Sequence, residues 1–337
     1  MQILQIKQQE QIYIQKSTPN ITQSSKNYCN TVSHKGHLGH ERIFKNGVKH
    51  FLRHETALFR DIQTKNFVKN YILNNFSNKP QIKMLVGACS TGEEVFTYSM
   101  LLDSLKSKLS ILGFDLSEKT IKQAKTGRVV MQELKSTPKN LINLYPTHFN
   151  DSFLCFKTKN LLTQEQLELK KLFDIFFEIQ TKKYKNKEPI AYRVQRWFMA
   201  KFLNLALPKY DSKIVKFKKE KFTNYNFKVG DILNLTEITK GEKVDVITFT
   251  NAMYHLTTDD VAKGLLRFPK ENTEDIVRDI AKNVKENLNP NGIFVLGENE
   301  VEQMMDSTSV PKVFKELGFE PLNKTEEHPE NVWKLIK

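Results

Sequence analysis

The sequence predicts an α/β fold with a doubly wound sheet that binds a ligand at one edge, and two strand ends carry this prediction. Residues 82–86 form an apolar run that predicts a buried strand, and apolar residues at helical spacing follow from Val95 onward. The turn between them, residues 87–94, reads GACSTGEE. A small-residue turn from a strand into a helix exposes backbone N–H groups and a helix N-terminus to a ligand. Because two carboxylates close this turn where a phosphate loop has Lys-Ser/Thr, the turn favours a cationic ligand.

A second predicted strand ends in an acid. Residues 110–115 are apolar and finish at Asp115, about 20 residues after the turn, where nucleoside-binding α/β folds place the acid that accepts ribose hydroxyls. Ser117 then predicts the cap of a helix that runs to Gly127. Turn, helix, strand and terminal acid together predict half of a doubly wound sheet that binds an adenosine-type ligand.

The composition is typical of one medium-sized domain with an appendage, or of two small domains. Of the 337 residues, 39% are hydrophobic and 10% aromatic, which suffices for a core and argues against global disorder. Cys29, Cys89 and Cys155 form no C-x-x-C pair, which favours a reducing, cytoplasmic location over a disulfide scaffold or a metal site. No apolar run approaches the roughly 18 residues of a membrane span, and no secretory signal is evident.

The net charge of +14 comes mainly from lysine, with 44 Lys against 8 Arg. Proteins that clamp phosphates rely on arginine forks, so this excess disfavours a nucleic-acid partner. The charge is uneven, because residues 151–225 hold 17 basic and 8 acidic side chains. Two interpretations stay open for this segment: a docking surface for an acidic partner protein, or a solvated face.

Five segments, in order, resemble one family. Residues 88–94 (ACSTGEE) resemble the CSTGEE signature of CheR-type methyltransferases, which use S-adenosyl-L-methionine to methylate glutamates of chemoreceptors. The other four segments are similar to T-x-F-F-R-[DE], T-D-I-[DS], F-D-x-I-F-C-R-N and P-G-G-x-L-x-x-G-x-x-E, at residues 56–61, 114–117, 244–251 and 290–300. The sequence is identified as a divergent member, over roughly residues 50–135 and 225–302. The resemblance implies a class I methyltransferase fold, a Rossmann-like, seven-stranded mixed sheet with helices on both faces. It also implies protein glutamate as the leading methyl acceptor.

The expected organisation follows from this resemblance. Residues 1–40 are predicted to be a flexible tail, residues 41–79 a segment with two helices, and residues 80–337 the methyltransferase domain. A basic, mostly helical insertion is expected at about 136–212, with helices at 164–183 and 189–205, where the family carries a small antiparallel β-subdomain that docks receptors. The main sheet is expected to resume at 213–218 and to end with an antiparallel pair that includes residues 332–336.

The resemblance also assigns the cofactor site. Thr56 is expected to bind the carboxylate of S-adenosyl-L-methionine, Glu94 its ammonium group and Asp115 its ribose hydroxyls. Arg60 reaches the cofactor pocket and, as a bidentate fork, is expected to orient an acceptor carboxylate as a catalytic residue. Three further residues of the turn are expected to bind the cofactor: Ala88, Ser90 and Glu93. For Glu93, the alternative is that it only complements the helix dipole.

The adenine and the acceptor are expected at the next two strand ends. Asn234 and Leu235 match the residues that frame adenine in the family, and Asp231 is a rival for the adenine amino group. Phe249, Thr250 and Asn251 are expected over the cofactor at the end of the fourth strand. Thr250 stands where the family has arginine, and His255 where it has tyrosine.

The acceptor chemistry leaves alternatives open. A carboxylate acceptor needs no base, since a group with a pKa of about 4.3 is ionised at pH 7. A hydroxyl or amine acceptor, on a small molecule or another side chain, needs one, and His255 is then the catalytic candidate, unless it only covers the loop. A third alternative is a non-catalytic module that binds the cofactor and docks a partner. His34, His37 and His40 lie three apart without a Cys or carboxylate to complete a metal site, so no metal is expected.

Overall fold

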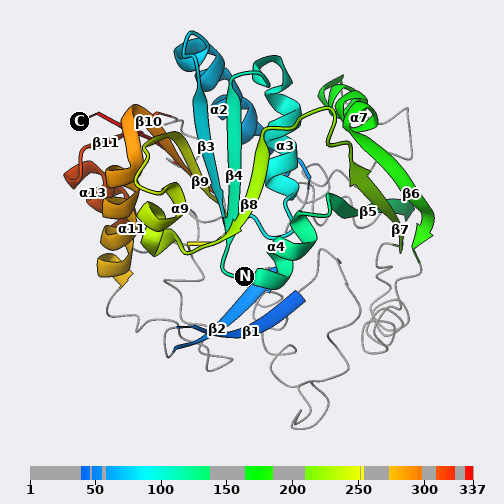
Figure 1. The fold of residues 1–337 in the computed structure, drawn as a ribbon, viewed down its shortest axis with the longest axis horizontal. Coiled ribbons are helices and arrows are strands. Elements are labelled where there is room, and N and C mark those ends of the chain that lie inside the picture. The colour runs from blue at the N-terminus through cyan, green and yellow to red at the C-terminus, as the bar shows by residue number, and fades with distance from the viewer. Residues whose placement is uncertain are drawn as a thin grey trace, which may run out of the picture.

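The computed structural model describes residues 39–45, 48–54, 58–136, 164–184, 209–250, 252–253, 273–297, 309–322 and 331–336. Its centre is a seven-stranded sheet of order β11-β12-β10-β9-β3-β4-β8 (Figure 1). The strands of this sheet are β3 (Ile82–Gly87), β4 (Leu109–Asp115), β8 (Tyr225–Val229), β9 (Val244–Phe249), β10 (Leu288–Leu296), β11 (Phe319–Pro321) and β12 (Val332–Leu335).

The strand order identifies the fold. Strands β8, β4, β3, β9 and β10 are parallel, and β12 lies antiparallel between β10 and β11. The chain starts in the middle at β3, moves outward through β4 to β8, and then crosses back to β9 on the other side of β3. A parallel sheet wound outward in both directions, with an antiparallel edge pair, is the class I methyltransferase arrangement. The predicted fold class is therefore confirmed.

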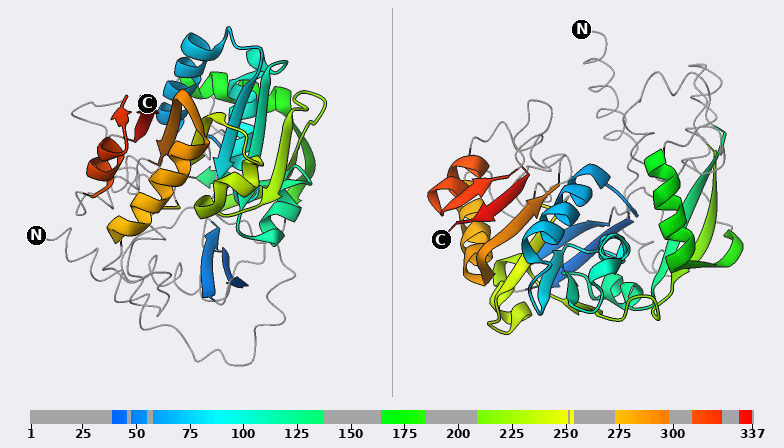
Figure 2. Two further views of the ribbon diagram at one scale, coloured as in Figure 1. Left: turned by 60° about the vertical axis from the view of Figure 1, so that its left-hand side comes forward. Right: turned by 90° about the horizontal axis from the view of Figure 1, so that it is seen from above.

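Helices cover both faces of this sheet (Figure 2). One face carries α2 (Ile62–Phe76), α3 (Glu93–Leu101) and α4 (Glu118–Ala124), and the other carries α9 (Leu235–Thr239), α11 (Thr273–Asn287) and α13 (Ser309–Glu316). Short 3₁₀ turns, η1 (Asp103–Leu105) and η3 (Ile232–Asn234), complete the connections. No helix in these ranges is both long enough and apolar enough to cross a membrane.

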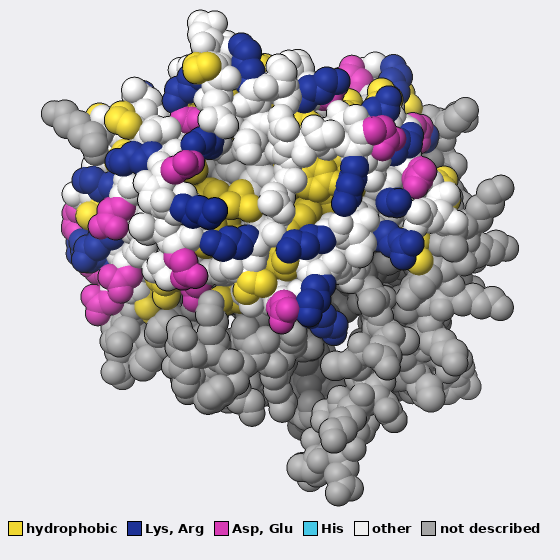
Figure 3. Space-filling model, in the orientation of Figure 1, with side chains coloured by type: hydrophobic (Ala, Val, Ile, Leu, Met, Phe, Trp, Pro, Cys, Tyr) yellow, Lys and Arg dark blue, Asp and Glu magenta, His cyan; other side chains and the backbone are white. Residues whose placement is uncertain are grey.

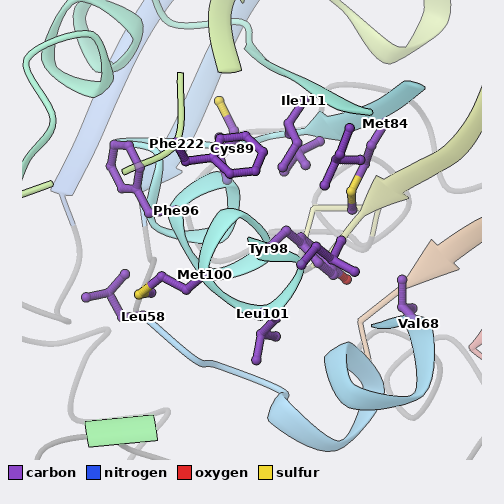
Figure 4. Packing of buried hydrophobic residues seen from close by; sticks show 14 of the residues in the cluster. Leu58, Val68, Met84, Cys89, Phe96, Tyr98, Met100, Leu101, Ile111 and Phe222 are labelled. Atoms are coloured by element: carbon purple, nitrogen blue, oxygen red, sulfur yellow. The ribbon is translucent and has the colours of Figure 1, made fainter. Parts of the chain in front are cut away.

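Two buried clusters explain why the layers form. Alternate residues of a strand point to opposite faces, so Met84 and Val86 join the cluster that includes Val68 of α2 and Tyr98 of α3, as Figure 4 shows for several members. Leu85, between them, joins the second cluster, under α11 and α13. Strands covered on both sides read as continuous apolar runs, which is why the sequence predicted them well.

A smaller antiparallel sheet, of order β5-β7-β6, adjoins α3 and corrects two predictions. It consists of β5 (Arg128–Ser136), β6 (Phe177–Tyr184) and β7 (Lys209–Phe217), and α7 (Gln164–Phe176) precedes β6. The helix predicted at 164–183 therefore ends at Phe176, and the strand predicted at 213–218 belongs to this sheet, not to the main one. The described part of the insertion contains both α7 and strand β6, and the predicted helix at 189–205 lies outside the described residues.

Aromatic contacts account for this difference. Phe96 of α3 stacks on Phe217 of β7, with ring centroids 4.7 Å apart, and meets Phe177 of β6 edge-on at 6.2 Å. These contacts join residues far apart in the sequence, and such tertiary packing overrides local helix propensity.

The segment before α2 also differs from its prediction. A hairpin of β1 (Gly39–Lys45) and β2 (Val48–His54) replaces the first of the two expected helices, whereas the second is confirmed as α2. Lys45 pairs with Val48, so two residues, Asn46 and Gly47, separate the strands in the sequence, and an Asn-Gly dipeptide is a strong hairpin signal. The expected tail at 1–40 lies outside the described residues up to position 38, and Gly39 and His40 belong to β1.

Candidate active site

Four parallel strand ends meet at one edge of the main sheet. Strands β3, β4, β8 and β9 run in the same direction, so their carboxyl ends lie together. The winding direction reverses between β3 and β9, and ligands of open α/β sheets bind in the crevice outside such a switch point. Of the predicted site residues, the ones that these ends bring to this edge are Ala88, Ser90, Glu93, Glu94, Asp115, Asp231, Phe249 and Thr250.

The turn after β3 has an unusual backbone. Ala88 and Ser90 have φ angles of 51° and 48°, in the left-handed region, and Gly92 has a φ of 96°. The turn is held by two backbone hydrogen bonds, from Cys89 N to Phe114 O at 3.1 Å and from Gly92 N to Cys89 O at 2.8 Å. Left-handed non-glycine residues cost about 1–3 kcal/mol each and cluster at ligand-binding sites. The conformation of this turn therefore indicates a functional loop.

Asp115 is buried next to this turn, with 8% of its surface exposed. Its Oδ2 atom accepts a hydrogen bond from Ser90 N, and its Oδ1 atom one from Ser117 N, both at 2.9 Å. A carboxylate has about four acceptor positions, so in general it can bind backbone amides and ligand hydroxyls together. The Ser90 hydroxyl is buried and has no hydrogen-bond partner in the described part of the chain, which leaves a polar group ready for a ligand.

Glu94 lies in the first turn of α3, on the other side of the end of β3. Its two carboxylate oxygens accept hydrogen bonds from residues of β9 and its end: Oε1 from Thr248 Oγ1 at 2.9 Å and Oε2 from Thr250 Oγ1 at 2.5 Å. Thr248 is not among the site residues predicted from the sequence. The two-residue period of a strand, which puts Thr248 on the same face as Thr250, was the signal for it.

The neighbouring Glu93 and Cys89 serve the turn itself. The Glu93 side chain is 3% exposed, and its two oxygens accept the Thr91 hydroxyl at 2.7 and 2.6 Å. Burial raises the pKa of the Cys89 thiol well above its ordinary value, and the carboxylates of Asp115, Glu94 and Glu93 raise it further. A thiol with a raised pKa stays protonated at neutral pH, so Cys89 is a packing residue and not a nucleophile.

Arg60 lies in a second strained segment. Phe59 and Asp61, on either side of it, have φ angles of 59° and 50°. Phe59 N donates to Thr97 Oγ1 of α3 at 3.1 Å, and the Arg60 carbonyl accepts from Lys65 Nζ at 2.7 Å. The first bond holds the segment against α3, in which Thr97 lies three residues after Glu94, and the second holds it against α2. Thr56, predicted at the same site, lies outside the described residues.

The residues predicted to bind adenine follow β8 and differ in how exposed they are. Gly230 N donates to Asp115 O at 3.0 Å, so Asp231 follows directly beside the end of β4, where its Oδ1 atom accepts from Leu233 N at 3.2 Å. Asn234 is exposed, and its amide donates to Glu237 Oε2 at 2.7 Å. Leu235 has no exposed surface and packs in the core with Phe249. Of the two residues expected to frame adenine, only Asn234 therefore lies at the surface. Asn251 and His255 lie outside the described residues.

Comparison with known proteins agrees with this geometry. Residues 54–178 match the family described as CheR methyltransferase, SAM binding domain. Over these residues the chain shows distant similarity to the CheR methyltransferases. Cher3 of Pseudomonas putida is 31% identical over 87 residues, which cover 25% of this chain and 32% of that protein. The chemotaxis protein methyltransferase of Borreliella burgdorferi is 26% identical over 144 residues, covering 36% of this chain and 50% of that protein. The chain thus spans half or less of these relatives.

Among solved structures, the N-methyltransferase NodS of Bradyrhizobium japonicum is similar with a TM-score of 0.32 and 10% identity, over 82% of this chain and 99% of that one. The cofactor of the matched CheR domain is S-adenosyl-L-methionine. The described residues fit S-adenosyl-L-methionine, because the fixed carboxylates of Asp115 and Glu94 and the unpaired Ser90 hydroxyl all lie at the strained turn after β3. Within the described ranges, no cluster of His, Cys, Asp and Glu side chains suits a metal ion.

Proposed function

We propose that this chain is an S-adenosyl-L-methionine-dependent methyltransferase that methylates a carboxylate side chain, glutamate above all, of a protein. The observation that carries this proposal is the pair of fixed carboxylates, Asp115 and Glu94, on either side of the end of β3. One suits a diol and the other a cation, and the cofactor has both groups. The match of residues 54–178 to the CheR domain supports the same cofactor.

Each residue then has a defined role. Asp115 accepts the ribose hydroxyls while it keeps its bonds to Ser90 N and Ser117 N, and Glu94 accepts the ammonium group. When bound, the cofactor supplies an electrophilic methyl group on a sulfonium. The chain must hold the acceptor about 3 Å from that methyl, in line with the leaving sulfur, and exclude water.

The acceptor proposal rests on Arg60. Its planar guanidinium binds a carboxylate through two parallel hydrogen bonds, which both orients and partly desolvates the acceptor. The strained backbone on both sides of Arg60 supports a role beyond packing. A carboxylate is already ionised at neutral pH, so the mechanism assigns no base.

A basic surface beside the small sheet supports an acidic protein partner. Arg128 of β5 lies directly opposite Lys216 of β7, and neither forms an ion pair in the described part of the chain. Like charges directly opposite each other destabilise a sheet, and Glu178, opposite Lys216 on β6, offsets one of the two, which leaves a net positive charge for an acidic partner. Lys125 and Lys216 also line a cavity of about 330 Å³ that includes Glu178 and Glu220. Lysine and arginine side chains are spread over the face shown in Figure 3, with acidic ones between them.

The test separates binding, turnover and acceptor. Calorimetry measures S-adenosyl-L-methionine binding, and methyl-labelled cofactor is incubated with glutamate-rich synthetic peptides. We expect label that mild alkali releases as methanol, because only carboxylate esters are so labile. Arg60→Lys should keep cofactor affinity within about twofold and lose more than about 90% of turnover, since an ammonium cannot replace the fork.

Three outcomes contradict parts of the proposal. No cofactor binding by the wild type refutes it entirely. Binding without any transferred label favours the non-catalytic module. Alkali-stable label indicates a hydroxyl or amine acceptor and directs attention to His255 as the base.

A further inference from the structure

We infer that Thr248 and Thr250 are positioning residues that hold the Glu94 carboxylate ready for the cofactor's ammonium group without neutralising its charge. This inference deepens the proposed function and rests on it. Both threonines are nearly inaccessible, with 0% and 8% of their surface exposed. They lie two residues apart at the end of β9, which pairs with β3, so both hydroxyls reach the start of α3 across the switch point.

The geometry restricts the carboxylate. One hydroxyl donates to each oxygen, so the plane of the carboxylate is set by two bonds from a rigid, buried strand. A free glutamate side chain loses up to about 2 kcal/mol of rotamer entropy when a ligand orders it. A side chain already ordered by the protein spares the ligand that loss, which is the physical basis of preorganisation.

The chemistry of the donors matters as much as their position. A hydroxyl has one proton, so each threonine that donates to Glu94 is a neutral partner. The carboxylate keeps its negative charge and about two of its four acceptor positions, which suits an ammonium group with three donors. An arginine at position 250, as the family pattern has, would instead bring a positive charge to this carboxylate if it paired with it.

The neighbouring glutamate provides the contrast. Glu93 binds the Thr91 hydroxyl within its own turn and is almost completely buried, as expected for a carboxylate that supports the loop. Glu94 is partly exposed at the crevice, yet two residues from a distant strand hold it. A carboxylate in the first turn of a helix is already favoured by the helix dipole, so these two donors are not needed for α3 to form.

The experiment measures affinity for two ligands that differ at the amino-acid end. S-adenosylhomocysteine carries the ammonium group, and 5′-methylthioadenosine lacks it. We expect Thr248→Val and Thr250→Val each to weaken S-adenosylhomocysteine binding by about fivefold to tenfold, because the Glu94 carboxylate loses one of the two bonds that order it. Methylthioadenosine affinity should change less than about twofold, and Thr250→Ser, which keeps the hydroxyl, should retain wild-type affinity for both.

Thr239→Val is the matched control, because the Thr239 hydroxyl is also buried and donates to Asn287 Oδ1 at 2.8 Å, away from the site. It should lower thermal stability but leave both affinities unchanged. A double-mutant cycle adds a second measurement: in a Glu94→Gln background, Thr250→Val should have little further effect on S-adenosylhomocysteine affinity. The inference is overturned if the valine variants bind S-adenosylhomocysteine normally, lose both ligands equally, or act independently of Glu94. Failure of the wild type to bind S-adenosylhomocysteine refutes the proposed function instead.

Discussion

The carboxylate of Asp115 accepts a hydrogen bond from the backbone amide of Ser90 at 2.9 Å, between residues 25 positions apart. This bond joins the end of β4 to the strained turn after β3. The group proposed to bind the ribose therefore also holds the turn in its left-handed conformation. Ligand binding and loop geometry at this edge depend on the same side chain.

Asp115→Ala should weaken S-adenosylhomocysteine binding at least tenfold, or about 1.4 kcal/mol, because hydrogen bonds to the ribose are lost. The variant should also lose about 1–3 kcal/mol of unfolding free energy, since the amides of Ser90 and Ser117 lose a buried acceptor. Calorimetry and urea denaturation measure the two effects.

Asp245→Ala is the control for this prediction. Asp245 is 2% exposed at the start of β9, where it accepts from Lys83 N at 3.0 Å and Asn289 Nδ2 at 2.9 Å. Its loss should destabilise the fold similarly while the folded variant keeps its affinity. Equal affinity losses in both variants would show that Asp115 acts only through stability.

Lys65→Met should reduce methyl transfer to glutamate-rich peptides by about tenfold and leave cofactor affinity nearly unchanged. The Lys65 ammonium, on a side chain that is 2% exposed, donates to the Arg60 carbonyl at 2.7 Å, so its removal frees the segment that carries the guanidinium. Such a loss of orientation typically affects turnover before binding. Lys69→Met, one turn further along α2, is the control and should behave like the wild type. Full activity of Lys65→Met would contradict the prediction.

Stability should fall at alkaline pH because of Tyr225. Burial raises the pKa of Tyr225 to about 12, and Glu220 contributes. An unfolded tyrosine releases its proton near pH 10, so between about pH 10 and 12 the unfolded state binds fewer protons and stability declines as pH rises. Tyr225→Phe should flatten this decline in urea denaturation at pH 8, 10 and 11.

Tyr71→Phe gives the comparison at pH 8. The Tyr71 hydroxyl donates to Asn291 O at 3.1 Å, whereas the Tyr225 hydroxyl is buried without a hydrogen-bond partner among the described residues. Removing the first should cost about 0.5–1.5 kcal/mol, and removing the second should be neutral or stabilising. The opposite ranking would indicate that the Tyr225 hydroxyl has a partner in solution.

Lys216→Gln should separate stability from partner binding. It relieves the like-charge contact with Arg128, so unfolding free energy should rise by a few tenths of a kcal/mol or stay constant, at about the scale of a cross-strand pair. Affinity for glutamate-rich peptides should fall at least threefold, and wild-type affinity should decline steeply above about 0.15 M salt, where the screening length is about 8 Å. Lys106→Gln, directly after η1, is the control. Peptide binding that does not depend on salt concentration would refute electrostatic docking of an acidic partner.

The sequence alone determined the elements whose signals are local. Strands β3 and β4 are apolar runs buried on both faces, and Ser117 caps α4 through a bond from Thr120 N at 3.2 Å, as its residue type predicted. The hairpin of β1 and β2 also had a local signal in Asn46-Gly47, so that error was one of interpretation. Strand β6 is different, because its conformation depends on contacts of Phe177 with Phe96 and Phe217.

The tertiary structure decided how the site is assembled. Glu94 and Asp115 stand out in the sequence because each lies at a strand end or strand–helix turn, where α/β folds bind ligands. Their partners do not stand out: Thr248 is an ordinary strand residue until β9 pairs with β3, and Lys65 is an ordinary helix lysine until the turn at Arg60 places a carbonyl beside it. Strand order and register arise from packing between residues far apart in the chain, so the groups that hold the site become visible only in the folded protein.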